Sequence, residues 1–443
     1  MSRAALVVPA ALLLLIGALP LAQERPPDLR LDIRGTGAER IPLAVPPFPV
    51  VSPGADAARQ ATDVHGVLSS DLEWCGLFDL IDRERLRLVT GVTDRDPRPR
   101  DWLAIGARAV FLGRLERNAA ELRVEGRLYD TGSGGDAGAP DQAPLIFGKR
   151  YSGGDELARR MAHKLANDVV RALTGLDGVF LTKIAYTQRL GPRQKEIHVI
   201  DYDGERPRRI TRNGSINLSP AWSPDGSRLA YVTFVTGRPE IHTIDAEGTQ
   251  SRVFAREGDL NSAPEWSPDG RSLLYSASRD GNSEIVQVDL EGGRMTRLTN
   301  HPAIDTSPAF APNGREIAFT SDRSGAPQIW VMDASGGNLR RATLEGNYND
   351  SAAWSPRGEL LAYTSRIEGR FDIMLLDLAS GTARRLTRDA GNNENPRFAP
   401  DGRHLVFASD RGGGYQIYSM DLGGGGVRRL TSGPPAETPD WSR

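Results

Sequence analysis

A period of 44 residues runs through the second half of the chain and constrains its fold more than any other feature. Each copy holds four short apolar runs separated by turn residues, and in one copy these runs are APEWS, SLLYSAS, SEIVQVD and MTRLT. Four antiparallel strands in about 44 residues is the size of a propeller blade. The positions that keep the step include Ile197, Ile241, Ile285, Ile329, Ile373 and Ile417, and Asp201, Asp245, Asp289, Asp333, Asp377 and Asp421. The period therefore predicts an all-β propeller.

The number of blades follows from two incomplete copies. The copy that starts at Lys183 contains only the back half of a unit, whereas TPDWS, which begins at Thr438, is a front half with nothing behind it. Joined, they make one whole blade, so we expect a six-bladed β-propeller closed by the C-terminal strand. Closure removes the exposed strand edges that an open ring would present.

The region before the repeats mixes helical and strand patterns without repetition. Apolar residues at helical spacing predict helices over 54–76 and 156–175, and two alternating runs predict a strand hairpin over 107–130. The Gly-rich stretch from Thr131 is interpreted as a flexible hairpin tip. We therefore expect an N-terminal α/β domain over 35–176, followed by the propeller over 177–443.

The first 22 residues carry one Arg, an apolar run and small residues before a predicted cleavage point near Ala22, which is the layout of a secretory signal. No later segment is predicted to span a membrane. A net charge of −2 gives no overall electrostatic attraction to nucleic acid. Cys75 is the single cysteine, so no intrachain disulfide is possible, and its helical spacing predicts a packed core position.

Two polar series in the repeats invite functional hypotheses. The aspartates from Asp201 to Asp421 end the third strand, too far from the axis to converge on one metal ion, and are expected to cap turns. A second series precedes the innermost strand: Asn217, Asn261, Asp305, Asn349 and Asn393. These side chains either form Asx-turns or present a polar ring to a peptide or protein at the channel mouth, and both roles can hold. A cation in the channel is a weaker alternative.

The aromatic series Trp222, Trp266, Phe310, Trp354, Phe398 and Trp441 is expected to pack between blades. The chain has no G-x-S-x-G, H-E-x-x-H, phosphate-loop or dinucleotide motif. The sequence therefore predicts no catalytic residue, no metal site and no cofactor.

The repeat PxWSPDGxxLaYxS, the export signal, the domain order and the stretch LRLDIRGTGAERIPLAVPPF resemble the TolB family, the periplasmic propellers of the Tol-Pal system. The resemblance implies a monomeric periplasmic adaptor that links TolA at the inner membrane to the lipoprotein Pal at the outer membrane. Such an adaptor supports envelope integrity and outer-membrane constriction during division. Other outer-membrane or peptidoglycan-associated proteins are further candidate partners; nucleic acid is not. The alternative is a periplasmic propeller enzyme or ligand-binding module.

The resemblance also implies two partner-binding regions. A flexible segment over 23–34 would bind TolA, through Asp28, Leu29, Arg30, Leu31, Asp32, Ile33 and Arg34. Pal is expected at the propeller mouth, where the first candidates are Leu260, Asn261, Ala263, Asp305 and Thr306, followed by Asn217, Asn349, Asn393, Glu437 and Thr438.

Overall fold

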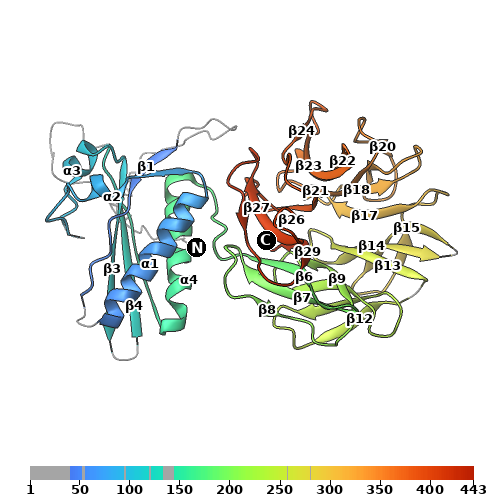
Figure 1. Ribbon diagram of the computed structural model, residues 1–443, viewed down its shortest axis with the longest axis horizontal. Coiled ribbons are helices and arrows are strands. Elements are labelled where there is room, and N and C mark those ends of the chain that lie inside the picture. The colour runs from blue at the N-terminus through green and yellow to red at the C-terminus, as the bar shows by residue number, and fades with distance from the viewer. Residues whose placement is uncertain are drawn as a thin grey trace, which may run out of the picture.

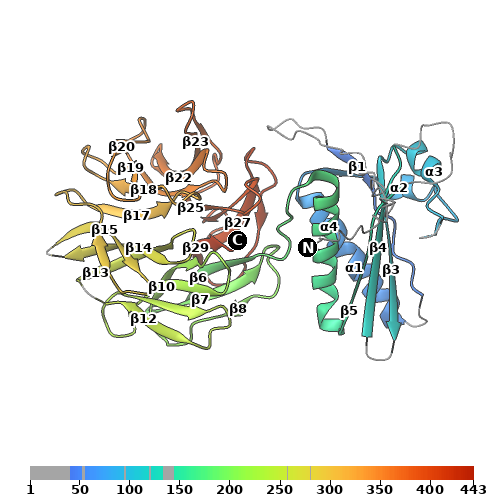
Figure 2. The same cartoon turned by 180° about the vertical axis from the view of Figure 1, so that it is seen from behind.

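The computed structural model describes residues 40–51, 55–93, 96–118, 121–132, 144–256, 258–279 and 281–443. Two domains lie side by side, a helix-covered sheet and a ring of six small sheets (Figures 1 and 2). This architecture confirms the predicted fold class. The predicted signal and the segment over 23–34 lie outside the described residues.

The first domain is built on one mixed five-stranded sheet in the order β2-β1-β3-β4-β5. Strand β1 is parallel to β2 and β3, and the remaining pairs are antiparallel. The strands are β1 (Ile41–Ala44), β2 (Phe78–Leu80), β3 (Ala109–Asn118), β4 (Glu121–Asp130) and β5 (Leu145–Gly153). The helices are α1 (Ala55–Trp74), α2 (Arg83–Leu86), α3 (Pro99–Ala104), the short 3₁₀ turn η1 (Asp155–Leu157) and α4 (Ala158–Thr174). In both views α1 and α4 lie between the sheet and the propeller.

Helices α1 and α4 form where apolar residues recur every three or four positions. On α1 these are Ala57, Ala61, Val64, Leu68 and Leu72, each at most 2% exposed. Helix α4 ends at Gly175, whose φ of +72° is a left-handed cap that side-chain-bearing residues adopt with strain. Strand β5 lies beyond the hairpin that the sequence predicted. Most of its side chains are exposed, so its sequence lacks the alternation that marks a half-buried strand.

The propeller consists of six four-stranded antiparallel sheets. Five blades are formed by consecutive strands: β9–β12, β13–β16, β17–β20, β21–β24 and β25–β28. Their bounds are β9 (Asn217–Trp222), β10 (Arg228–Thr233), β11 (Glu240–Asp245), β12 (Ser251–Ala255), β13 (Leu260–Trp266), β14 (Ser272–Arg279), β15 (Asn282–Asp289), β16 (Met295–Arg297), β17 (Asp305–Phe310), β18 (Glu316–Ser321), β19 (Gln328–Asp333), β20 (Arg340–Arg341), β21 (Asn349–Trp354), β22 (Leu360–Ile367), β23 (Arg370–Asp377), β24 (Ala383–Arg385), β25 (Asn393–Phe398), β26 (His404–Ser409), β27 (Gln416–Asp421) and β28 (Arg428–Arg429).

The sixth blade is shared between the two ends of the repeat region. Strand β29 (Ala436–Trp441) pairs with β6 (Lys183–Gly191), which continues into β7 (Gln194–Asp201) and β8 (Arg208–Arg209). The register places Trp441 opposite Ile184. The structure therefore confirms six blades and the closing role of the last strand.

The aromatic series packs where the sequence predicted. All six side chains are at most 9% exposed. The indole N–H of Trp266 donates to the Ala221 carbonyl and that of Trp354 to the Ala309 carbonyl, each at 3.1 Å. Because each bond crosses from one blade to its neighbour, these residues fix the angle between blades.

The two domains share one continuous apolar core. Trp74, the last residue of α1, stacks on His404 with ring centroids 3.8 Å apart, and its ring also lies near Tyr202 and Trp441. Trp441 therefore both completes the sixth blade and contacts the sheet domain.

Candidate partner-binding site

The polar series at the start of the innermost strands is buried, which favours the structural one of the two roles expected for it. Asn217, Asn261, Asp305, Asn349 and Asn393 are at most 1% exposed. In the unbound chain these side chains therefore serve the structural role, and their contact with Pal stays a prediction.

Four of these side chains tie their innermost strand to the blade before it, whereas Asp305 is paired within its own blade. Asn217 donates from Nδ2 to the Glu196 carboxylate at 3.1 Å, and Asn349 donates to the Gln328 side chain at 2.8 Å. Asp305 accepts two bonds from the Arg323 guanidinium, at 2.8 and 3.0 Å. Buried polar groups paired in this way stabilise one arrangement of neighbouring strands.

Asn217, Asn349 and Asn393 donate to members of a polar series that the sequence analysis missed. Glu196, Glu240, Glu284, Gln328, Asp372 and Gln416 also recur every 44 residues. A threonine of the outer strand donates to most of them; Thr299 bonds to Glu284 and Thr387 to Asp372, both at 2.6 Å. The period was visible in the sequence, but the cross-blade register that joins the two series was not.

Four of the six aspartates that end the third strands cap turns, as predicted, whereas Asp201 pairs with Lys183 and Arg206 and Asp333 accepts from the Asn338 side chain. Asp245 accepts from the backbone N–H of Thr249 at 2.9 Å and from its hydroxyl at 2.6 Å. The hydroxyl bond and then the backbone bond hold the pKa of Asp245 below its ordinary value. Asp377 likewise accepts from the N–H groups of Ala379 and Ser380.

The mouth of the propeller keeps an accessible surface beside the buried series. Leu260 is 40% exposed, and Ile304, at the equivalent place in the next blade, is 52% exposed. Thr306, Glu437 and Thr438 are partly exposed. Lys195 contacts the Glu437 carboxylate at 2.6 Å, so that part of the rim is charge-paired. Apolar and polar contacts thus lie next to each other around the mouth.

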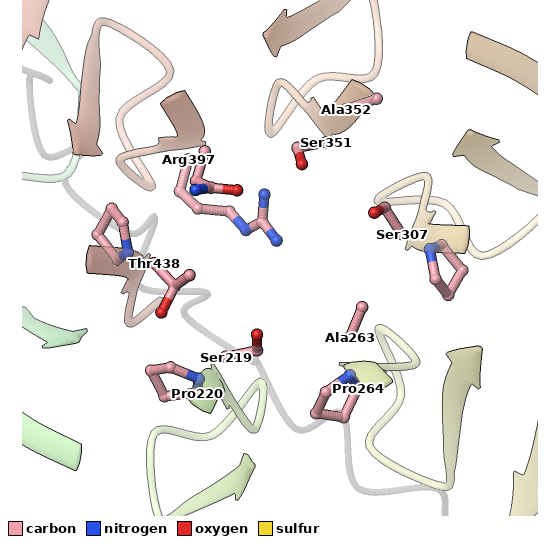
Figure 3. Close-up of a pocket in the computed structure, with 12 residues that line it drawn as sticks. Ser219, Pro220, Ala263, Pro264, Ser307, Ser351, Ala352, Arg397 and Thr438 are labelled. Carbon is pink, nitrogen blue, oxygen red and sulfur yellow. The ribbon is translucent and has the colours of Figure 1, made fainter. Parts of the chain in front are cut away.

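Below this rim, the innermost strands bulge at one equivalent residue in every blade. The bulge residues have φ between +47° and +57°, and they are Ser219, Ala263, Ser307, Ser351, Asn395 and Thr438. The strand register shifts at these points. Together with Arg397 the bulges line a cavity of about 90 Å³ (Figure 3). The predicted site residue Ala263 thus belongs to the channel wall.

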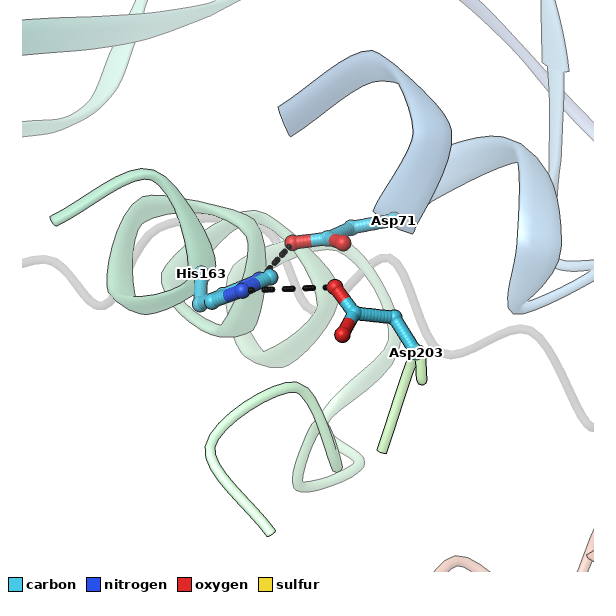
Figure 4. A group of neighbouring side chains, drawn as sticks. All are labelled: Asp71, His163 and Asp203. Atoms are coloured by element: carbon cyan, nitrogen blue, oxygen red, sulfur yellow. Dashed lines mark hydrogen bonds and ion pairs between the residues drawn. The ribbon is translucent and has the colours of Figure 1, made fainter. Parts of the chain in front are cut away.

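A polar cluster joins the sheet domain to the propeller. His163 of α4 lies between two carboxylates, with Nδ1 2.7 Å from Asp71 and Nε2 3.6 Å from Asp203 (Figure 4). Tyr202 donates to Asp71, and Arg159 pairs with Asp203. Burial raises the pKa of Asp71.

Asp71, His163 and Asp203 also form a group that could hold a metal ion, because one ligand atom from each lies within 4.8 Å of the others. Both carboxylates are already paired, however, Asp203 with the permanently charged Arg159. We therefore interpret the cluster as a link between α1, α4 and the propeller.

Cys75 is buried, and its thiol donates to the Leu72 carbonyl at 3.1 Å. Burial raises the pKa of this thiol to about 12, so it is not an activated nucleophile. The packed-core prediction for Cys75 is confirmed. No helix within the described part of the chain is long and apolar enough to cross a membrane.

Comparison with known proteins gives concordant results for both domains. A family model described as the TolB beta propeller domain matches residues 170–379 and 353–443, and one described as the TolB amino-terminal domain matches 29–136. The chain is 37% identical over 222 residues to the Tol-Pal system protein TolB of Dinoroseobacter shibae, covering 49% of this chain and 48% of that protein. It is 38% identical over 236 residues to that of Bordetella pertussis, covering 52% and 48%.

These sequence matches span about half the length of the curated relatives. The crystal structure of TolB from Acinetobacter baumannii is similar over 91% of this chain and 97% of that one, with a TM-score of 0.77 and 29% identity. Both domains, in the same order, are therefore shared, and the chain belongs to the TolB family of Tol-Pal system proteins.

Proposed function

We propose that the protein is a non-enzymatic periplasmic adaptor that joins TolA at the inner membrane to Pal at the outer membrane. In this role it supports envelope integrity and outer-membrane constriction during division. Membership of the TolB family supports the proposal, since the relatives are Tol-Pal system proteins. The observation that carries it is the exposed apolar rim at the propeller mouth, where Leu260 and Ile304 stand at equivalent places in adjacent blades.

Pal would dock over this rim. Exposed apolar side chains at neighbouring positions favour a protein partner because docking removes them from water. Thr306, Glu437 and Thr438 offer hydrogen-bonding groups beside them. The buried asparagines and Asp305 would act indirectly, by holding the strands from which these contacts project.

TolA would bind the segment from Asp28 to Arg34. Its sequence DLRLDIR alternates apolar and charged residues, which suits addition of one strand to the edge of a partner's sheet. The domain interface would couple this event to Pal binding, because α1 and α4 contact the blades directly.

Calorimetric titration with purified Pal tests the docking surface. Leu260→Asp places a charge at the rim and is expected to weaken binding at least about tenfold, which corresponds to about 1.4 kcal/mol. Met295→Asp is the matched control, because Met295 lies in the outer strand of the same blade and is 43% exposed. Equal Pal affinity of both variants and the parent would refute the proposed surface.

Deletion of Gln23 to Arg34 tests the TolA arm. We expect TolA binding to be lost and Pal affinity to change; an unchanged Pal affinity would remove the coupling between the two sites. Recovery from envelope extract of a saccharide or a turned-over substrate, without Pal, would instead support the alternative of an enzyme or ligand-binding module.

A further inference from the structure

One position of each innermost strand distinguishes the blades from one another inside the channel. It lies immediately before the packed aromatic residue, and its six occupants are Ala221, Glu265, Ala309, Ala353, Arg397 and Asp440. Three blades place a methyl group here and three place a charge. Because the fold accepts alanine at this position, the three charged side chains are not required to close the propeller.

Arg397 lies between two cavities of the channel. It lines the cavity of about 90 Å³ at the bulge residues and a second cavity of about 360 Å³ beside the aromatic series. Its guanidinium points toward the centre of the channel, and the hydroxyl groups of Ser219, Ser307 and Ser351 face the same space (Figure 3). The smaller cavity therefore combines one cation with several neutral hydroxyl groups.

The hydrogen bonds of Arg397 leave part of its donor capacity unused. Nη1 donates to the Pro396 carbonyl at 3.1 Å, and Nε is 3.5 Å from the Asp440 carboxylate. Within the described part of the chain, Nη2 has no hydrogen-bond acceptor. A guanidinium carries five N–H donors, so it can receive a further planar acceptor in a two-bond arrangement.

The acids near Arg397 compensate its charge incompletely. Burial raises the pKa of Glu265 to about 7 and also raises that of Asp440, whereas the guanidinium stays charged. Arg443 is the other charged group that faces this part of the channel. At the mouth, Glu437 is paired with Lys195, Glu394 accepts a bond from Tyr415, and Asp350 accepts one from Thr320. The channel around Arg397 therefore favours an additional negative group.

We propose that the smaller cavity binds a single carboxylate group, held by the guanidinium of Arg397 and flanked by the hydroxyls of Ser219, Ser307 and Ser351. The cavity of about 90 Å³ has room for a carboxylate group. The permanent charge of Arg397 excludes a cation from this cavity.

The carboxylate belongs either to a free small acid or to a protein docked at the mouth. The carboxylate site itself does not rest on the proposed adaptor function. Only a carboxylate supplied by a docked protein rests on it. In both cases Glu265 competes with the ligand for Arg397 once it ionises. Affinity for the carboxylate is therefore expected to rise as the pH falls from 8 to 6.

Saturation-transfer NMR with acetate as the probe tests the site on the full mature chain. Arg397→Ala, which introduces the residue of three other blades, is expected to weaken acetate binding about tenfold. Arg388→Ala is the control, because it removes the same charge from an exposed position just before the same innermost strand. Glu265→Gln should bind acetate more tightly than the parent at pH 8 and about equally at pH 6. Equal acetate binding by the parent and Arg397→Ala, or no pH dependence in the parent, would overturn the proposal.

A titration of the same variants with Pal separates the two sources. If Arg397→Ala also weakens Pal binding about tenfold, the carboxylate comes from the docked protein; if Pal affinity is unchanged while acetate binding is lost, the ligand is a free acid. Both results support the site. Absence of Pal binding by the parent would refute the adaptor function, and the acetate titration would still decide the carboxylate site.

Discussion

Substitution of Trp441 tests whether the last strand closes the propeller. Trp441 is 4% exposed, pairs with Ile184 across the seam of the sixth blade, and donates from its indole N–H to the Thr182 hydroxyl at 2.8 Å. Its ring also contacts Trp74 of the sheet domain, with centroids 6.4 Å apart. One substitution therefore weakens both the ring closure and the contact between domains.

The expected cost follows from these contacts. Replacing a buried Trp by Ala lowers the free energy of unfolding by about 3–5 kcal/mol. Deleting Pro439 to Arg443 also removes two bonds of Ser442. Its N–H donates to the Lys183 carbonyl at 2.8 Å, and its hydroxyl oxygen accepts from the Lys183 N–H at 2.9 Å. At about 1 kcal/mol each, these bring the loss to about 5–7 kcal/mol. A domain of ordinary stability, about 5–15 kcal/mol, would lose much of its margin.

Differential scanning calorimetry measures this loss, with two matched variants. Trp441→Phe keeps the aromatic ring, as Phe310 and Phe398 do in other blades, and is expected to cost about 1–2 kcal/mol. Trp266→Ala should lower the propeller transition as much as Trp441→Ala, but should leave the contact with Trp74 intact. A deletion variant as stable as the parent would show that β29 does not complete a blade.

Three further changes probe buried charge and backbone strain. Arg323→Leu leaves the fully buried carboxylate of Asp305 without its cation. We expect this change to lower the free energy of unfolding by about 3–5 kcal/mol in urea titrations, and a second substitution, Asp305→Asn, to restore part of that loss. The pKa of Glu265 is about 7 in the folded chain and 4.5 ordinarily, so between these pH values the folded chain binds more protons than the unfolded chain. The parent therefore loses stability as the pH rises from about 4.5 to about 7. Glu265→Gln should flatten the stability profile and gain on the order of 2 kcal/mol at pH 8. Gly204→Ala, at a φ of +90° with the new methyl 2.7 Å from the Leu430 carbonyl oxygen, should cost about 1–3 kcal/mol by thermal unfolding.

The propeller could be predicted because tandem copies repeat the same pattern of strands and turns, so each copy confirms the others. Helices α1 and α4 could be predicted because their apolar residues keep helical spacing. Strand β5 could not, because an edge strand with exposed faces carries no alternation. The fold could thus be predicted wherever burial produces a periodic pattern of apolar residues.

The candidate site was predicted less well than the fold. Equal spacing identified Asn217 and its counterparts as equivalent, but it could not show that their side chains turn into the blades. That orientation depends on partners such as Glu196 on a neighbouring strand. The cluster around His163 could not be predicted from the sequence either, because Asp71 and Asp203 come from segments that are far apart in the sequence and share no common spacing.

The pairing of β29 with β6 has a consequence for the order in which the molecule matures. The hydrogen bond between the Lys183 N–H and Ser442 joins residues 259 positions apart, and contacts of such long range form late because loop closure must precede them. In a chain made from its N-terminus, β29 follows the strands of the other five blades, so β6 meets this partner only after them. Trp441 also contacts Trp74. A chain that lacks β29 would therefore have an open sixth blade, and its domain interface would lack one of its aromatic contacts.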